Sequence, residues 1–191
     1  QSIIKEFNQG ITDEMSKLHM SCRFATKFAY KENLAPSGDS DVEFLLSTSP
    51  SGKLLPLKDI ASGGELSRAS LAISKVVAQN SQVPCLIFDE ADSGIGGKIA
   101  ARVGQSLAEL GKDAQIISIT HQPQTAVYAD NHYAVAKSHD GTTTISKIKL
   151  LNQEERLEEI ARMLSGEKME QDALDYATKM IDQAILNVDR H

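Results

Sequence analysis

The stretch that decides the fold of this chain is Cys85-Leu86-Ile87-Phe88-Asp89-Glu90-Ala91-Asp92-Ser93-Gly94. The apolar run begins at Val83, and a continuous run of this kind is typical of a strand buried in a parallel sheet. It leads directly into two adjacent carboxylates, Asp89 and Glu90. Ligands of open α/β sheets bind beyond the carboxyl ends of the strands, so we expect a binding site here.

The two carboxylates can do different work, because neighbouring residues of an extended chain point to different sides. One can hold Mg²⁺, usually through water, since this ion keeps much of its hydration. The other can polarise an attacking water molecule. The alternative is that Asp89 or Asp92 only caps the helix that follows. That interpretation explains one carboxylate and leaves the second unexplained.

Helix and strand alternate on both sides of this stretch. Helical periodicity occupies residues 63–79 and 98–110, and a second apolar strand is expected at 115–120. A strand, a helix and a strand of these lengths predict a βαβ unit with a right-handed crossover. The second strand leads into Thr120-His121-Gln122-Pro123-Gln124. A lone histidine is more often structural, but the βαβ connection places His121 near the carboxylates, where it could hydrogen-bond a terminal phosphate.

A third cluster opens the helix at residue 63. Ser62 followed by Glu65 has the spacing of a capping box, a common structural feature. Gly63 and Gly64 between them each cost up to about 1 kcal/mol relative to alanine inside a helical turn. Glycine permits close approach to the backbone, and a helix N-terminus attracts anions. The residues leave two interpretations open, a phosphate-binding helix start and an ordinary capped helix.

The sequence before residue 60 predicts a helix followed by antiparallel strands. Apolar residues recur at three- and four-residue spacing from Ile3 to Leu18, as in a helix. This helix is either the end of a coiled coil or a single amphipathic helix packed on the domain. Strands are expected at residues 22–30 and 42–47, with a loop at 34–40 and a turn at 50–52.

The sequence at the end of the chain predicts a hairpin followed by two helices. The hairpin strands are expected at residues 131–137 and 143–150, around the turn Asp140-Gly141. Amphipathic helices are expected at residues 153–164 and 167–187.

Composition limits the class of protein. The 191 residues carry a formal net charge of −6, a poor electrostatic match for DNA without a local basic patch. No apolar stretch is long enough to cross a bilayer, and the first ten residues do not form a secretory signal. The two cysteines, Cys22 and Cys85, favour a reducing cytoplasm. The chain begins with Gln rather than Met, so we expect a piece of a longer protein.

The phosphate-cradling pattern G-x-x-x-x-G-K-[ST] is missing from the sequence. The run Gly94-Ile95-Gly96-Gly97-Lys98 looks similar, but Asp92 occupies the first glycine position and Ile99 replaces the hydroxyl residue. We interpret this run as a turn that leads into the next helix. Zinc binding by His132 and His139 is not expected, because they lie on a hairpin with loose spacing.

Taken in order, the three clusters resemble the heads of ABC-type ATPases. More narrowly, the chain resembles the C-terminal part of the RecN family of bacterial DNA-repair proteins, relatives of the SMC proteins. The resemblance is carried by the runs Ile60–Arg68, Leu86–Gly94 and Thr120–Gln124, and it extends to residues 42–45 and 154–164. The combination is specific, although each run alone is weak.

This resemblance implies an α/β fold, the C-terminal lobe of a P-loop ATPase head, with a mixed sheet and flanking helices. Residues 21–191 would form this lobe, and residues 1–20 would be the returning end of a coiled-coil helix. In the family the phosphate-binding loop lies on an N-terminal lobe beyond the coiled coil, which fits its absence here.

The resemblance also implies roles for individual residues. Asp89 matches the Mg²⁺-associated acid, Glu90 the general base and His121 the switch histidine. The signature motif, which contacts the terminal phosphate of ATP on the opposite subunit, is matched by Ser62, Gly63, Gly64 and Glu65. Ser93 opens the loop that crosses the dimer interface. Two departures are Gly96, where many ABC heads carry aspartate, and Gln122, where RecN relatives often carry an apolar residue.

The implied function is ATP hydrolysis, with ATP and Mg²⁺ as cofactors, in repair and recombination at DNA double-strand breaks. The implied partners are the N-terminal lobe of the same protein, a second head in an ATP-sandwiched homodimer, and DNA through the full protein. No membrane is involved, and the setting is the bacterial cytoplasm near the nucleoid. The isolated piece would be inactive. Two alternatives stay open, a non-catalytic ATP-dependent dimerisation module and a head fragment of another SMC-like protein.

Overall fold

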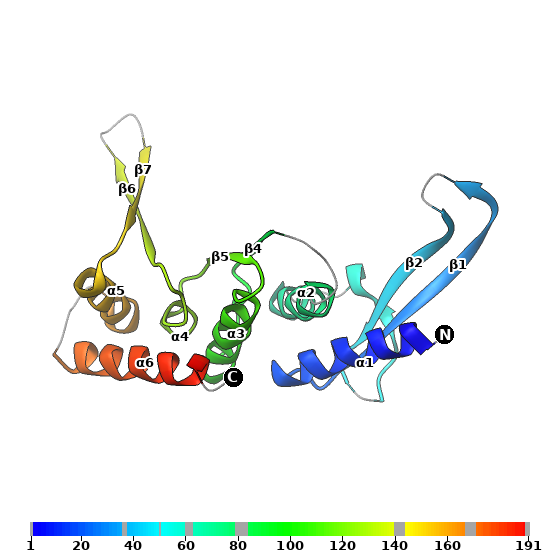
Figure 1. The fold of residues 1–191 in the computed structure, drawn as a ribbon, viewed down its shortest axis with the longest axis horizontal. Coiled ribbons are helices and arrows are strands. Elements are labelled where there is room, and N and C mark those ends of the chain that lie inside the picture. Colours follow the sequence, from blue (N-terminus) through cyan, green and yellow to red (C-terminus); the bar gives the residue numbers. More distant parts are fainter. Residues whose placement is uncertain are drawn as a thin grey trace.

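The elements follow one another along an elongated molecule in a computed structural model (Figure 1). The structure describes residues 2–35, 38–49, 51–59, 63–78, 84–139, 144–166 and 171–189. Two hairpins rise from the same side at opposite ends of the molecule, with helices between and below them. Among the described helices, none is both long and apolar enough to span a bilayer.

The first part combines α1 (Ser2–Lys17) with an antiparallel sheet of β1 (Arg23–Ala35), β2 (Gly38–Ser47) and the short β3 (Leu55–Pro56). The helix packs on the sheet through a core that includes Ile11, Met15, Phe24 and Leu46. Ile3, near the start of α1, stays 81% exposed. The helix therefore packs on the domain along its later turns, while its first turn is open to solvent.

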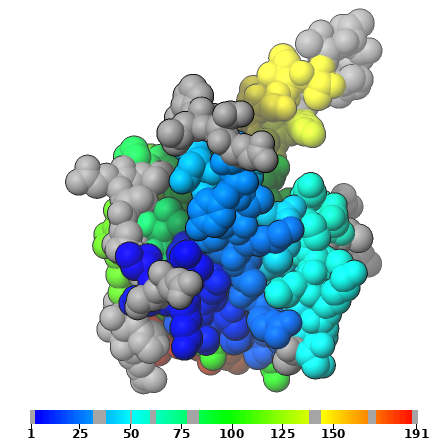
Figure 2. All heavy atoms as spheres, turned by 90° about the vertical axis from the view of Figure 1, so that its right-hand side faces the viewer, coloured from blue at the N-terminus to red at the C-terminus, as the bar shows by residue number. Residues whose placement is uncertain are grey.

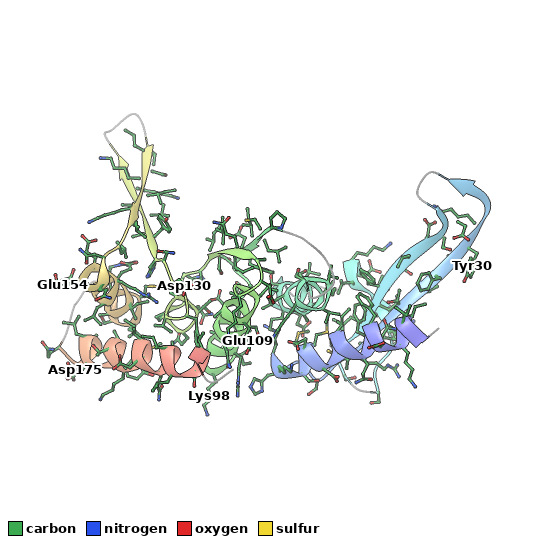
Figure 3. All side chains as sticks on the ribbon, in the orientation of Figure 1. Tyr30, Lys98, Glu109, Asp130, Glu154 and Asp175 are labelled. Atoms are coloured by element: carbon green, nitrogen blue, oxygen red, sulfur yellow. The ribbon has the colours of Figure 1, made fainter. Side chains whose placement is uncertain are left out.

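The loop expected at residues 34–40 is too long. In the structure β1 continues to Ala35, which pairs with Gly38 at the start of β2. Gly38 has a φ of +106°, a conformation that only glycine adopts readily, and this allows an abrupt reversal. Pro36 lies outside the described residues. Figure 3 shows Tyr30 on the outer part of this hairpin.

The central part confirms the expected βαβ unit. After the one-turn helix η1 (Leu57–Asp59) comes α2 (Gly63–Ala78), then β4 (Cys85–Asp89), α3 (Gly97–Leu110) and β5 (Gln115–Ile119). β4 and β5 pair in parallel, with Asp89 opposite Ile119. Leu71, Phe88 and Val103 form the core between α2, β4 and α3.

The expectation that these parallel strands are buried is wrong for the chain as described. Ile87 in β4 is 66% exposed, and Ile117 and Ile119 in β5 are about half exposed. The reason is that β4 and β5 form a sheet of only two strands within the described residues. An apolar face of this sheet and its edges are left uncovered.

The last part begins with the four-residue helix α4 (Pro123–Ala126), which was not expected from the sequence. The predicted hairpin follows as β6 (Tyr133–His139) and β7 (Thr144–Leu150), which pair antiparallel. Every residue of β7 is exposed, and Figure 2 shows this strand projecting beyond the rest of the surface.

Two predicted helices close the chain, α5 (Gln153–Ser165) and α6 (Gln171–Asp189). They pack together around Ile160, Ala161 and Ala177. The start of α5 is fixed by a capping box, in which Asn152 and Glu155 each accept a hydrogen bond from the other's backbone N–H. The predicted α/β fold with flanking helices is confirmed. In the described residues the strands form three separate sheets, one parallel and two antiparallel, so the expected mixed sheet is not formed by these residues alone.

A buried lysine joins three helices. Lys75 of α2 places its Nζ atom 3.0 Å from Oε2 of Glu14 in α1 and 2.5 Å from Oε2 of Glu109 in α3. Figure 3 labels Glu109 on α3. Burial opposes the charge on Lys75, but the hydrogen bonds to Glu109 and Glu14 outweigh it and raise the pKa of this lysine. The helices α1, α2 and α3 therefore share one network of charges.

Candidate active site

The two carboxylates predicted from the sequence lie where β4 ends. Asp89 is the last residue of the strand, and Glu90 follows with a φ of +48°, in the left-handed region. A tight turn holds this conformation, because the Glu90 N–H donates to the Ile119 carbonyl at 2.9 Å and the Ser93 N–H donates to the Glu90 carbonyl at 2.9 Å. Such backbone strain costs about 1–3 kcal/mol and persists only where the surroundings impose it.

His121 lies beside Glu90, as the βαβ connection predicts. The Nδ1 atom of His121 is 3.8 Å from Oε1 of Glu90, and both side chains are more than half exposed. An exposed pair at this distance contributes little to stability. The arrangement therefore leaves both groups free to meet a ligand at the carboxyl edge of the sheet.

Asp92 does not cap the following helix. The N-cap of α3 is Gly96, and no side chain caps this helix. Asp92 is instead only 1% exposed, and its Oδ2 atom accepts a hydrogen bond of 2.5 Å from the Thr120 hydroxyl. The structure thus rejects helix capping by Asp92 and leaves Asp89, at the strand end, free for another role.

The surroundings of Gly64 explain why a glycine is required near the start of α2. A Cβ atom added to Gly64 would lie well under 3.0 Å from the carbonyl oxygen of Ser93, a contact that real Cβ atoms do not make. A Cβ at Gly63 would meet nothing within 4 Å. The close approach anticipated from the sequence is therefore real at Gly64, and the approaching group is the backbone of the loop after β4. Ser62 lies outside the described residues.

Comparison with known proteins gives the chain a family. No family model matches it. The DNA repair protein RecN of Streptomyces coelicolor is 43% identical over 149 residues, which cover 78% of this chain and 26% of the relative. RecN of Halalkalibacterium halodurans is 33% identical over 189 residues, covering 96% of this chain and 34% of the relative. The chain belongs to the RecN family. It spans about a quarter to a third of the length of these RecN relatives.

Solved structures agree on the fold. The Smc head domain of Pyrococcus yayanosii, with a coiled coil and joint, aligns with a TM-score of 0.63 at 21% identity, over 84% of this chain and 29% of that chain. The SmcHead bound to the C-winged helix domain of ScpA aligns with a TM-score of 0.59 at 22% identity, over 79% of this chain and 44% of that chain. This RecN-family chain therefore has the fold of part of an SMC ATPase head.

The donor set of this RecN-family chain suits a weakly held, hydrated cation. In the part of the chain that the structure describes, no three His, Cys, Asp or Glu side chains come together as a metal site. Asp89 is exposed at the strand end, and one carboxylate with water is a usual arrangement for Mg²⁺ beside a phosphate group. The pattern G-x-x-x-x-G-K-[ST], which would hold the phosphates, does not occur in the sequence.

One residue of the site was missed by sequence reasoning. Thr120 belongs to the polar run that carries the resemblance, but no role was predicted for it, and its hydroxyl proves to be the partner of buried Asp92. The available signal was weak, since it consisted of a hydroxyl residue directly before the candidate histidine.

Proposed function

We propose that this chain is the C-terminal lobe of a RecN-type ATP-hydrolysing head. Asp89 associates with Mg²⁺ through water, Glu90 is the general base and His121 contacts the terminal phosphate. The observation that carries the proposal is the meeting of Glu90 and His121, from two different strand ends, next to Asp89. They meet at the carboxyl edge of a parallel pair, where α/β proteins bind ligands.

In this proposal the residues transfer a proton and orient the terminal phosphate. The Glu90 carboxylate accepts a proton from water as that water attacks the terminal phosphorus in line, and His121 holds the phosphate oxygen through a ring N–H. When bound, Mg²⁺ neutralises charge on the phosphates. The turn that fixes Glu90 in a left-handed conformation also fixes the direction of its side chain. A general base must be oriented in this way before the substrate binds.

The missing phosphate loop is proposed to lie on an N-terminal lobe of the same protein. Two features support this: the chain spans only part of its RecN relatives, and the two-stranded sheet exposes Ile87, Ile117 and Ile119. Apolar side chains on a parallel pair are normally covered by further strands or helices. A lobe that adds strands to this sheet would cover them and bring the phosphate loop to the site.

A second head is the proposed partner for the start of α2. A helix N-terminus with glycines suits the phosphate of a nucleotide bound to another subunit, so Ser62, Gly63, Gly64 and Glu65 are proposed to reach across a homodimer, with Ser93 at the interface. One structure with this fold comes from a study of ATP-driven dimerization and DNA stimulated activation of SMC ATPases. DNA is proposed to be engaged through the full protein, because a net charge of −6 makes this chain a poor electrostatic match for DNA without a local basic patch.

The test uses the full-length protein and the variant Glu90→Gln. Loss of the base is expected to lower kcat roughly 100- to 1,000-fold, while ATP binding and ATP-dependent association persist. Glu158→Gln, at an exposed acid on α5, is the matched control and should leave kcat unchanged. The 191-residue chain alone should show negligible turnover until an N-terminal lobe is added.

An undiminished rate in Glu90→Gln would remove this residue from the role of base. Robust turnover by the chain alone would contradict the two-lobe proposal. If the wild type hydrolyses no ATP, while ATP-dependent association survives both Asp89→Asn and Glu90→Gln, the chain is a non-catalytic dimerisation module.

A further inference from the structure

Two loops that adjoin the candidate site in the sequence are hydrogen-bonded to each other. One follows β4 and contains Asp92 to Gly96, and the other follows β5 and contains Thr120 to Gln122. Four hydrogen bonds lie within and between these segments, three of them from one loop to the other. Asp89 and Glu90 directly precede the first of these segments, and His121 lies within the second, so the hydrogen bonds influence how the site residues are held relative to one another.

Gln122 makes two of these hydrogen bonds with a single amide group. Its Nε2 atom donates to the Asp92 carbonyl at 2.6 Å and to the Ile95 carbonyl at 3.2 Å. Both partners are acceptors, so the NH₂ end of the amide must face them and the orientation of the side chain is chemically determined. One side chain therefore holds two carbonyls of the loop that connects β4 to α3.

Thr120 and Asp92 add a second tie between the loops. The Thr120 hydroxyl accepts a hydrogen bond from the Gln122 backbone N–H at 2.8 Å, so its own proton is directed to Asp92 Oδ2 at 2.5 Å. Asp92 is almost fully buried, and its other carboxylate oxygen has no partner in the described residues. Hydrogen bonds to a buried carboxylate are among the stronger ones, and losing one leaves a costly unpaired charge.

His121 lies between Thr120 and Gln122 in the sequence, and its side chain faces Glu90. Thr120 and Gln122 both contact the loop after β4, while the His121 ring lies 3.8 Å from Glu90. This alternation is what extended backbone produces. A shift of the loop would therefore carry both neighbours of His121 with it and change the distance between His121 and Glu90.

We infer that Gln122 is a positioning residue, which fixes His121 and Glu90 relative to each other by tying the segment after β5 to the loop after β4. Because Gly64 of α2 touches the Ser93 carbonyl of the same loop, the tie also connects His121 to the start of α2. This inference rests on the proposed function in assigning hydrolysis to Glu90 and His121.

The experiment compares Gln122→Glu and Gln122→Leu in the full-length protein, with Gln153→Glu, at an exposed position of α5, as the matched control. Both Gln122 variants keep the approximate size of the side chain and lose the NH₂ group. We expect kcat to fall roughly 10- to 100-fold, as displacement of reacting groups by about 1 Å does, while the KM for ATP changes less than about threefold.

A pH profile separates positioning from simple structural damage. At low pH the new carboxylic acid of Gln122→Glu is protonated and donates one hydrogen bond to a loop carbonyl, whereas the deprotonated carboxylate repels both carbonyls. Because a Glu carboxyl has a pKa of about 4.3 and the facing carbonyls disfavour its charged form, the kcat of Gln122→Glu relative to wild type should rise as the pH falls from 7.5 to 5. The same ratio for Gln122→Leu should stay flat, because leucine has no proton to donate.

Hydrogen exchange supplies a readout that does not depend on hydrolysis. Peptides that cover residues 91–97 should exchange faster in both Gln122 variants, while peptides from α6 should not change. If wild type hydrolyses no ATP, the proposed function fails and the exchange result still tests the tie. Unchanged kcat with unchanged exchange at 91–97 overturns the inference, as does a kcat ratio that is flat with pH in both variants.

Discussion

At the scale of single residues, the site depends on backbone positions that tolerate few alternatives. Glu90 adopts a left-handed conformation that is uncommon for residues other than glycine. Gly64 lies so close to the Ser93 carbonyl that no side chain fits. The two positions share the loop after β4, since the Ser93 N–H donates to the Glu90 carbonyl. A substitution at Gly64 should therefore also shift the backbone that carries Asp89 and Glu90.

We predict that Gly64→Ala destabilises the 191-residue chain by about 1–3 kcal/mol, because the new methyl group overpacks against a backbone atom that cannot rotate away. Gly63→Ala is the matched control, with open space around the new Cβ and a slightly better helix former. Urea unfolding followed by circular dichroism measures both. Equal stability of the two variants would show that α2 does not lie against Ser93.

At the scale of elements, the charge network around Lys75 connects α1 to the two helices of the site region. Lys17 and Lys75 both contact Glu14, and Lys75 also contacts Glu109. Burial raises the pKa of Glu14, but the hydrogen bonds from Lys17 and Lys75 have the larger combined effect and lower it. If residues 1–20 continue into a coiled coil, as the resemblance implies, this network would link the coil to α2 and α3.

We predict that Lys75→Met destabilises the chain by about 1–3 kcal/mol, because it leaves partly buried carboxylates on Glu14 and Glu109 without their shared cation. Lys17→Met, at a lysine that is mostly exposed, should change the free energy of unfolding by less than about 0.5 kcal/mol. The double variant Lys75→Met with Glu109→Gln should recover part of the loss. No recovery would mean that the two side chains are not coupled.

At the scale of the whole molecule, three apolar clusters follow one another along the chain and meet through the central helices. The third cluster contains the helices α5 and α6, and beside it lies His132 near Arg156 and Glu159. Burial lowers the pKa of His132, the positive charge of Arg156 lowers it further, and Glu159 opposes both. The net result is a lowered pKa, so the folded protein takes up a proton at His132 less readily than the unfolded chain does.

We predict that acidification destabilises the protein through His132. Its folded pKa lies below its unfolded pKa of about 6.5, so the unfolded chain takes up the proton first. Stability is complete above that value and is lost as the pH falls toward the folded pKa. The fall in thermal midpoint between pH 7.5 and 5.5 should be smaller in His132→Gln than in wild type, and unchanged in His19→Gln, at an exposed histidine. Equal slopes in all three proteins would contradict the prediction.

Much of the fold could be predicted because its signals are local. Periodicity identified α1, α2, α3, α5 and α6, and strand patterns identified the antiparallel pairs β1–β2 and β6–β7. The turn predicted at Asp140-Gly141 lies outside the described residues. The helix α4 was missed because four residues are too few to show a period, and only Pro123 at its first position hinted at it. Burial of β4 was predicted wrongly, because an apolar strand sequence does not say whether a covering element lies within the same chain.

The sequence by itself determined the order of the elements, the RecN-like motifs and the placement of Asp89, Glu90 and His121 at adjacent strand ends. These follow from short-range patterns and from the handedness of a βαβ connection. Tertiary structure alone decided the hydrogen bonds of Asp92 with Thr120 and Gln122, whose partners lie 28 and 30 residues apart. It also decided the contact of Gly64 with Ser93. Such contacts depend on how packed elements bring distant atoms together, and no local periodicity encodes them.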